Sequence, residues 1–349
     1  MNLKDSRYKD FCLVREMMET PGIIGRFDFS AAGQTAEESI EAGKLLLTGE
    51  GSSRIFPAKN MISEALRIGA PLRVVTDGAR QAHEYDLGDF AVFGASNSGK
   101  TKEVISLFTQ LSQNGHQRRF ALTANRDTPL ETLSSRCHLL ICGKENAVAA
   151  TKSVVEQAMF YRSILSRMEK DPSLLVRNQP AAAAAALATL EAELDAEIVR
   201  AIAAAPVIYF AGRNNGVAEE LTLKTNEITR KKSDFLEGTY AVHGVEEVMR
   251  GGEVVVVIEP FAEEMAKFKE VLVDGVGLKV IALSAGQTCF PTIRIPTVPG
   301  YETVLQLLAG WNVLVHVGVA LAVNLDKAER ARKIGNEFLG CQTTTTTDP

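Results

Sequence analysis

The sequence lacks several features that would assign it to a special class of protein. Its 349 residues include one tryptophan, 6% aromatic residues and a net charge of −5, which argues against nucleic acid as the main partner. The five cysteines are odd in number, scattered and without metal-type spacing. They indicate reduced thiols in a cytoplasmic protein. No His, Cys and Asp cluster has the spacing of metal ligands, so we expect neither a metal nor a cofactor. The cysteines are Cys12, Cys137, Cys142, Cys289 and Cys341.

Long hydrophobic signals are also scarce. The first residues, 1–6, contain no apolar segment of the kind found in secretory signals. The apolar stretch 303–323 contains Gln306, Asn312 and His316, which favour a buried core helix over a membrane span. An apolar content of 46% with 23% charged residues is typical of a soluble globular protein, and the length suits two domains. We therefore expect no membrane partner.

Short apolar runs alternate with helical patterns along most of the chain. This alternation implies right-handed βαβ units and parallel sheets. The two halves repeat the same plan, which suggests a duplication. The sequence predicts an α/β fold of two tandem flavodoxin-like lobes, each a parallel five-stranded sheet flanked by helices. The predicted strands are 44–48, 72–76, 90–93, 120–125 and 138–142 in the first half, and 207–210, 253–258, 278–283 and 292–295 in the second.

Prolines, glycines and changes in composition along the chain predict five segments. The segment 1–30 contains a lead-in helix, whose pattern from Tyr8 to Thr20 is stopped by Pro21. The other segments are a first lobe at 31–175, a linker helix at 176–205 that includes an alanine run, a second lobe at 206–340, and a tail at 341–349. The tail has no apolar pattern, so it is expected to be disordered.

The strongest chemical signal is the turn Ser96–Thr101, which lies between a predicted strand and a predicted helix. Backbone N–H groups and the dipole at a helix start favour an anion, and Ser96, Ser98 and Thr101 add hydroxyl donors. Another serine- and glycine-rich turn, 49–53, follows the first predicted strand. In a flavodoxin-like order these two strands are neighbours, so both turns face one crevice. The two turns together predict a phosphate site.

Two families of phosphate loop fit this turn. Residues 94–101 satisfy the nucleotide pattern G-x-x-x-x-G-K-[ST] with Lys100 in the lysine position, and residues 96–101 fit a sugar-phosphate loop of the form Ser-x-Ser-Gly-x-Thr. A nucleotide loop usually follows the first strand of its sheet and needs a magnesium-binding aspartate at a strand end. The candidate is Asp77, which precedes the loop. The sugar-phosphate reading is therefore favoured, and the nucleotide reading stays an alternative.

Several motifs, in order and spacing, resemble one family. Residues 51–53 are similar to a Gly-Thr-Ser loop and residues 96–101 to a Ser-Gln-Ser-Gly-Glu-Thr loop. Residues 145–152 are similar to Glu-x-x-Val-Ala-Ser-Thr-Lys, and residues 220–228 to Glu-Gly-Ala-Leu-Lys-Leu-Lys-Glu-Ile. The spacing from Glu227 to His243 also fits. Over about residues 10–340 the chain resembles the sugar isomerase (SIS) domain family, in particular the isomerase half of glucosamine-6-phosphate synthase.

The resemblance implies a phosphosugar site and a proton-transfer mechanism. Glu227 would be the base that moves a proton between C1 and C2, His243 would assist ring opening from the other subunit of a homodimer, and Lys333 would lie near the sugar carbonyl. Taken without the resemblance, the residues favour Glu227 as an exposed helix acid paired with Lys231. The substrate-binding residues implied are Ser52, Ser53, Ser96, Asn97, Ser98, Thr101, Val148 and Glu220.

Departures from the family pattern leave the reaction open. The acid and lysine that precede the histidine in the family are replaced in 239–244, and Lys100 stands where the family carries an acid. The glutamine-hydrolysing domain of the synthase is not encoded in this sequence, so full synthase activity is not expected. We therefore expect an aldose–ketose isomerase, or a deaminase or deglycase that acts on an aminosugar or sugar-amine phosphate. The alternatives are a non-catalytic phosphosugar sensor and a P-loop nucleotide hydrolase.

Overall fold

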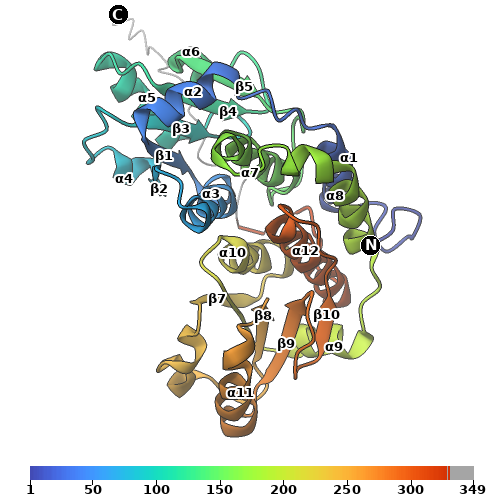
Figure 1. The fold of residues 1–349 in the computed structure, drawn as a ribbon. Coiled ribbons are helices and arrows are strands. Elements are labelled where there is room, and N and C mark those ends of the chain that lie inside the picture. The colour runs from blue at the N-terminus through green and yellow to red at the C-terminus, as the bar shows by residue number, and fades with distance from the viewer. Residues whose placement is uncertain (328, 331–349) are drawn as a thin grey trace, which may run out of the picture.

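A computed structural model describes residues 1–327 and 329–330, and its chain forms two α/β lobes that lie one above the other in Figure 1. The first sheet has the order β2-β1-β3-β4-β5 and the second the order β10-β9-β8-β6-β7. All neighbouring strands are parallel. Counted within each lobe, both orders are the flavodoxin-like 2-1-3-4-5, so the predicted fold is confirmed. The strands are β1 (Lys44–Gly49), β2 (Arg73–Gly78), β3 (Ala91–Ala95), β4 (Arg119–Thr123), β5 (Arg136–Leu139), β6 (Val207–Gly212), β7 (Lys232–Glu237), β8 (Val254–Ile258), β9 (Lys279–Ser284) and β10 (Thr292–Arg294).

Helices cover both sheets and fill the space between the lobes. The α-helices are α1 (Cys12–Arg26), α2 (Gly33–Ala42), α3 (Ile55–Ile68), α4 (Ala79–Ala82), α5 (Lys102–Gln113), α6 (Pro129–Leu133), α7 (Lys152–Leu165), α8 (Leu174–Glu191), α9 (Ala196–Ala204), α10 (Val217–Thr229), α11 (Met265–Phe268) and α12 (Glu302–Ala320). Short 3₁₀ segments are η1 (Gly51–Ser53), η2 (Ser166–Met168), η3 (Tyr240–Val242), η4 (Val245–Val248) and η5 (Ala262–Glu264), and η6 (Lys269–Val276) is a π-helix. The predicted tail at 341–349 and Lys333 lie outside the described residues.

Three local predictions were wrong. Pro21 does not stop the lead-in helix but lies buried inside α1, whose apolar face packs against α7 and α8. This packing outweighs the hydrogen bond that the proline cannot donate. The linker is two helices, α8 and α9, separated at Ala192–Asp195. The helical pattern of residues 262–273 predicts one helix, but the structure divides this segment into η5, α11 and η6.

The strand β7 was not recognised in the sequence. It is an edge strand that pairs with β6, and its first four residues alternate between exposed and half-buried, whereas Leu236 is buried. Because one side of an edge strand is solvated, its sequence Lys-Ser-Asp-Phe-Leu-Glu lacks the continuous apolar pattern of the central strands.

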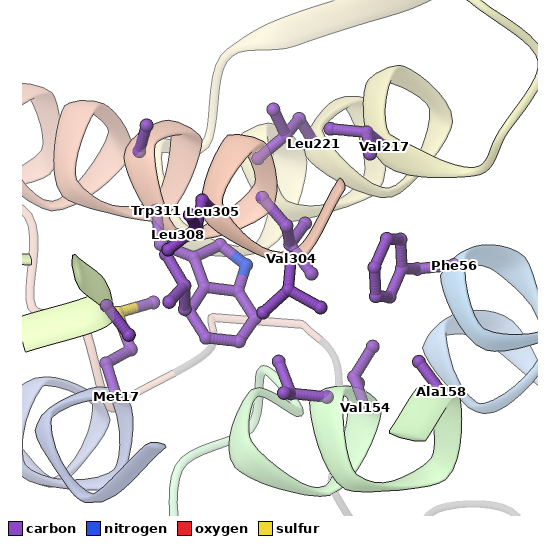
Figure 2. Packing of buried hydrophobic residues seen from close by; sticks show 14 of the residues in the cluster. Met17, Phe56, Val154, Ala158, Val217, Leu221, Val304, Leu305, Leu308 and Trp311 are labelled. Atoms are coloured by element: carbon purple, nitrogen blue, oxygen red, sulfur yellow. The ribbon is translucent and has the colours of Figure 1, made fainter. Parts of the chain in front are cut away.

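The two lobes share one hydrophobic core. Figure 2 shows Val304 and Trp311 of α12 beside Phe56 of α3, Val154 of α7 and Met17 of α1, all in the same buried cluster. The helix α12 is long and apolar enough to cross a membrane, but 78% of its apolar window is buried inside the protein, as in a core helix. The central position of α12 therefore explains its composition.

Close approach of α10 and α12 depends on Gly310. A Cβ atom at this position would lie 2.3 Å from a methyl carbon of Leu221, which is fully buried. The backbone of Gly310 is helical, so its small size rather than its conformational freedom is what the site requires.

We predict that Gly310→Ala lowers the free energy of unfolding by about 1–3 kcal/mol, because the added methyl overpacks the α10–α12 contact. The matched control is Gly22→Ala in α1, where the nearest atom is the flexible end of Arg26 at 3.2 Å. Helix propensity alone favours alanine at both sites. Denaturant unfolding of both variants checks this, and equal stabilisation of the two would contradict it.

A histidine ties α2 to β5. The His138 ring lies 2.9 Å from Thr35 Oγ1 and packs against Phe160, with 4.5 Å between ring centroids. Burial, assisted by the nearby Arg136, lowers the pKa of His138 to about 4. The folded protein therefore holds His138 neutral over a pH range in which the unfolded chain, with a pKa of about 6.5, takes up a proton.

The free energy of unfolding should consequently fall as the pH drops from about 6.5 towards 4, since the unfolded state binds the proton first. His138→Leu removes this contribution and should reduce the pH dependence by up to about 1.4 kcal/mol per pH unit in that window. Denaturant melts of both proteins between pH 4 and 7 measure the difference. Parallel curves would show that His138 does not carry the effect.

Candidate functional site

The β3–α5 loop forms a closed turn held by its own hydroxyl groups. Ser96 Oγ lies 2.8 Å from Thr101 Oγ1 and accepts a hydrogen bond from the Gly99 N–H at 3.1 Å. The Lys100 N–H donates to Ser98 Oγ at 3.2 Å. Thr101 is the N-cap residue of α5, but its side chain makes no capping bond. The hydroxyl of Thr101 is thus used to shape the loop rather than to cap the helix.

Two glycines of this segment have different roles. Gly99 has a φ of +67°, and a Cβ atom there would lie 2.5 Å from Thr128 Oγ1. Gly94 lies inside β3, where a Cβ atom would lie 2.5 Å from the Phe108 ring. Gly94 is the first glycine of the nucleotide-loop pattern, and its role is strand–helix packing. Gly99 is the glycine that the turn itself requires.

Asn97 connects the β3–α5 loop to the turns after β4 and β5. Its carbonyl oxygen accepts from Asn125 Nδ2 at 2.7 Å and from the Ala124 N–H at 3.1 Å. Its own Nδ2 donates to the Gly143 carbonyl at 3.3 Å. The turn after β1 also packs closely against the end of β3, since a Cβ at Gly49 would lie 2.8 Å from the Ala95 carbonyl oxygen. The carboxyl ends of the strands thus form one continuous surface.

The turn after β1 reaches the second lobe through Ser52. Lys224 Nζ on α10 donates to Ser52 Oγ at 2.7 Å and to Glu227 Oε2 at 2.7 Å, and lies 3.3 Å from Glu220 Oε1. Lys224 and Glu220 have no exposed side-chain surface, whereas the Glu227 side chain is 26% exposed. The candidate base therefore lies at the surface end of a buried ionic cluster that joins both lobes. Lys224 was not predicted as a site residue.

Burial and ion pairing oppose each other in this cluster. It raises the pKa of Glu220, and Lys224 opposes the shift. Burial also acts to lower the pKa of Lys224, but Glu227 and Glu220 together outweigh it, so the pKa of Lys224 is raised. Lys224 consequently stays charged and holds Glu227 by an ion pair. The alternative partner of Glu227, Lys231, donates instead to the Ala203 carbonyl at 2.8 Å.

The loop that carries Val148 is fixed by two buried carboxylates. Glu145 accepts from the Thr151 N–H at 2.7 Å and from Ser153 Oγ at 2.5 Å. Glu16 on α1 accepts from the Asn146 N–H at 2.5 Å. Val148 itself is half-buried. The sequence offered Glu145 as part of a motif, but its role as the anchor of the loop becomes visible only in the structure.

Three further predicted site residues are His243, Ser53 and Lys333, and the first two make no hydrogen bond with Lys224 in the described part of the chain. His243 follows η3 and is exposed, and its neighbours Tyr240 and Val248 expose 54% and 71% of their surfaces. Ser53 is half-buried beside Ser52. Lys333 lies beyond the described residues. Within one chain, then, Glu227, Glu220 and Ser52 come together, whereas His243 lies on a separate exposed loop.

The second lobe closes the corresponding end of its own sheet. Arg213, after β6, stacks on the Phe261 ring at 4.2 Å and donates to the Glu259 carbonyl. The Glu259 carboxylate accepts from the Ala285 N–H at 2.6 Å and from Ser284 Oγ at 3.1 Å. A cavity of about 10 Å³ remains there. The strand ends of the second lobe are thus filled by its own side chains.

Larger cavities do not coincide with these residues. A cavity of about 840 Å³ is lined by Glu41, Arg118 and Ser135, which lie at the opposite, amino ends of the first-lobe strands. In parallel α/β sheets, ligands bind at the carboxyl ends, so the chemistry of the loops identifies the site better than cavity size. Among the described residues, no group of three or more His, Cys, Asp or Glu side chains could hold a metal ion.

The nucleotide alternative has weak geometric support. Asp77 lies at the end of β2, which β1 separates from β3. Its carboxylate oxygens accept from the Gly78 N–H at 2.8 Å and from the Tyr85 hydroxyl. A magnesium ligand would be expected beside the phosphate loop.

Comparison with known proteins agrees with the arrangement of the first lobe. The family model described as SIS domain matches residues 40–167. These residues are therefore similar to a SIS domain. The match spans β1 to α7, and therefore contains Ser52, the Ser96–Thr101 loop and Val148. A search of curated proteins found no match.

Solved structures extend the likeness to both lobes. The C-terminal domain of glucosamine-fructose-6-phosphate aminotransferase from Francisella tularensis has a TM-score of 0.72 at 16% identity, covering 91% of this chain and 98% of that one. Tagatose-6-phosphate ketose/aldose isomerase from Escherichia coli has a TM-score of 0.73 at 16% identity, covering 93% and 97%. Glucosamine-6-phosphate deaminase from Thermotoga maritima has a TM-score of 0.68 at 17% identity, covering 92% and 98%. At these identities the likeness shows a shared fold of two flavodoxin-like lobes.

We predict that Gly99→Ala distorts the β3–α5 loop, which the sequence predicts to bind a sugar phosphate. Gly115→Ala is the matched control, because Gly115 has a φ of +70° but nothing within 4 Å of its added Cβ. Both variants carry the strain of a left-handed alanine, about 1 kcal/mol, and Gly99→Ala adds the contact with Thr128. Thermal unfolding and sugar-phosphate binding should both be impaired more in Gly99→Ala. Equal effects of the two substitutions would contradict the assigned role.

Proposed function

We propose that this chain is a phosphosugar enzyme that transfers a proton between C1 and C2 of a hexose 6-phosphate. The reaction is an aldose–ketose isomerisation, or the release of an amine from an aminosugar or sugar-amine phosphate. The supporting observation is the link from the turn after β1, one of the two predicted phosphate-binding turns, to a helix acid: Ser52 Oγ, Lys224 Nζ and Glu227 Oε2 are joined by two hydrogen bonds of 2.7 Å. A sugar whose phosphate meets the first-lobe loops would have its carbon chain near Glu227.

The proposed chemistry follows from the carboxylate. Glu227 takes the proton from C2 of the open-chain aldose, and the electrons of the C–H bond form a C1–C2 double bond and leave an enediolate with its charge on O1. A proton moves from O2 to O1, and Glu227 returns its proton to C1 as the C2 carbonyl forms, which gives the ketose. Lys224 holds one carboxylate oxygen, and the other is left for the substrate. The phosphate would bind the hydroxyls and backbone amides of the loop at the start of α5. Neither a metal nor a cofactor is required by this route.

A homodimer with shared active sites completes the proposal. The exposed loop that carries His243 also exposes Tyr240 and Val248, which are apolar side chains suited to burial against another surface. We propose that this loop docks on a second copy and brings His243 to its sugar, with Lys333 supplying the cation near the carbonyl. The protein would act in the cytoplasm, with neither nucleic acid nor membrane as partner.

The first test is a thermal-shift panel. Fructose 6-phosphate, glucosamine 6-phosphate and related sugar phosphates should raise the melting temperature, because they bind the folded state, and ATP with magnesium should not. Stabilisation by ATP alone would overturn the sugar-phosphate assignment and favour the nucleotide hydrolase.

The second test separates an enzyme from a sensor. Glu227→Gln should retain sugar-phosphate binding but lower turnover by about 100-fold or more, because the amide cannot accept the carbon-bound proton. Glu263→Gln, on the exposed segment η5, is the control for loss of one surface carboxylate and should behave as wild type. Binding without turnover in the wild-type protein would instead support the phosphosugar sensor.

A further inference from the structure

Ser52 belongs to two assemblies at once. It lies in the SIS loop that is proposed to hold the substrate phosphate, and it is also the first-lobe partner of Lys224. The adjacent Ser53 hydroxyl makes no hydrogen bond within residues 1–327, so only one of the two serines connects this loop to the second lobe through its side chain. The two neighbours therefore offer a natural comparison. The inference below rests on the proposed function.

The Ser52 hydroxyl lies between Lys224 and Glu220. A serine hydroxyl accepts through its lone pairs and donates its single proton. In the structure Ser52 Oγ accepts from Lys224 Nζ at 2.7 Å, and the hydroxyl also interacts with the buried Glu220 carboxylate, so a phosphate oxygen has to compete with Glu220 for the Ser52 proton. Donation to the phosphate instead of Glu220 frees the Glu220 carboxylate for Lys224, and so changes how Lys224 divides its hydrogen bonds between Glu220 and Glu227.

Lys224 has no freedom to respond in another way. Its side chain has no exposed surface, and the three hydrogens of its ammonium face Ser52, Glu227 and Glu220 at 2.7, 2.7 and 3.3 Å. Water cannot replace a lost partner at a fully buried cation, so any change at Ser52 alters the two contacts with the carboxylates. The side of α10 that packs on α12 meets uncharged residues, since the segment 304–315 of α12 contains none with a charge.

The surrounding backbone keeps the two lobes at a fixed separation here. A Cβ at Gly216, the residue before α10, would lie 2.7 Å from the Cα of Phe56 in α3. Nearby, Lys59 pairs with Glu219, and Asn60 Nδ2 donates to Thr303 Oγ1 at 2.9 Å. The contact between Ser52 and Lys224 is thus part of a rigid interface and does not depend on a hinge.

We propose that Lys224 is a positioning residue that transmits occupancy of the phosphate loop through Ser52 to Glu227. The phosphate then contributes to the orientation of the base as well as to affinity. Ser53 contributes to affinity alone. A sugar without its phosphate would be a poor substrate even at saturation.

The test compares Ser52→Ala with Ser53→Ala in the full chain, using the sugar phosphate that the wild-type protein turns over. Both substitutions remove one proposed phosphate contact, so both should raise KM about three- to tenfold. Ser52→Ala alone removes the bond to Lys224, and its kcat should fall about tenfold further than that of Ser53→Ala. Ser52→Thr, which keeps the hydroxyl, should recover most of kcat. Melting temperatures of all variants establish that each is folded.

A second measurement separates the phosphate from the sugar. Phosphite dianion should accelerate turnover of the unphosphorylated sugar by the wild-type protein and by Ser53→Ala. Ser52→Ala should still be stabilised by phosphite through the Ser96–Thr101 loop, but phosphite should not accelerate its turnover. This readout does not depend on how well the variant binds the complete substrate.

The outcomes distinguish this inference from the proposed function. Equal kcat losses in Ser52→Ala and Ser53→Ala, or equal activation of both by phosphite, would overturn the role of Lys224 and leave the enzyme assignment intact. Absence of turnover and of stabilisation by every sugar phosphate in the wild-type protein would overturn the function itself.

Discussion

A lysine ammonium removed from water requires acceptors that do not move, and Lys224 obtains them from both lobes. Glu220 and Glu227 are supplied by its own helix, α10, and Ser52 by the turn after β1. Leaving such a charge without partners costs several kcal/mol, so the relative placement of the two lobes is determined by this cluster as well as by apolar packing. The small residues Gly216 and Gly310 permit the close helix contacts that bring these groups together.

Much of the fold could be predicted because it follows from local patterns. The apolar strand, glycine turn and amphipathic helix around Ser96–Thr101 are contiguous in the sequence, and alternation of such units implies parallel sheets. The edge strand β7 and the breaks in the helical segments could not be predicted in the same way. Exposed edges tolerate polar residues, and packing against α7 and α8 keeps Pro21 within a helix where local rules would end it.

The candidate site was predictable only in part for a related reason. The loop hydroxyls can be predicted because the strand, glycine turn and helix around them are contiguous in the sequence. Lys224 and Ser52 are 172 residues apart and meet only in the folded chain. The spacing of Glu220, Lys224 and Glu227 places all three on one helix face, which is the signal that could have pointed to a buried ionic cluster. Without knowledge of what covers that face, the same spacing describes an ordinary solvated helix.

The two lobes have the same strand order, but different kinds of residue occupy the carboxyl ends of their strands. In the first lobe the strand ends present hydroxyls and backbone amides. In the second lobe, Arg213, Phe261 and Glu259 occupy the equivalent region, and the helix α10 contributes its charged face instead. The two lobes therefore share a strand order but differ at their strand ends, and in the proposed function each lobe supplies a different part of the site.

The continuous core beneath Trp311 has a consequence for how the chain gains its structure. Because α12 contributes buried surface to both lobes, the final long helix of the described chain packs against residues made near its beginning. In a ribosome-bound chain in which α12 has not yet been synthesised, the apolar faces of α1, α3 and α7 that α12 packs against would be exposed to solvent. We therefore expect the two lobes to fold together, late in synthesis, and not one after the other as independent domains.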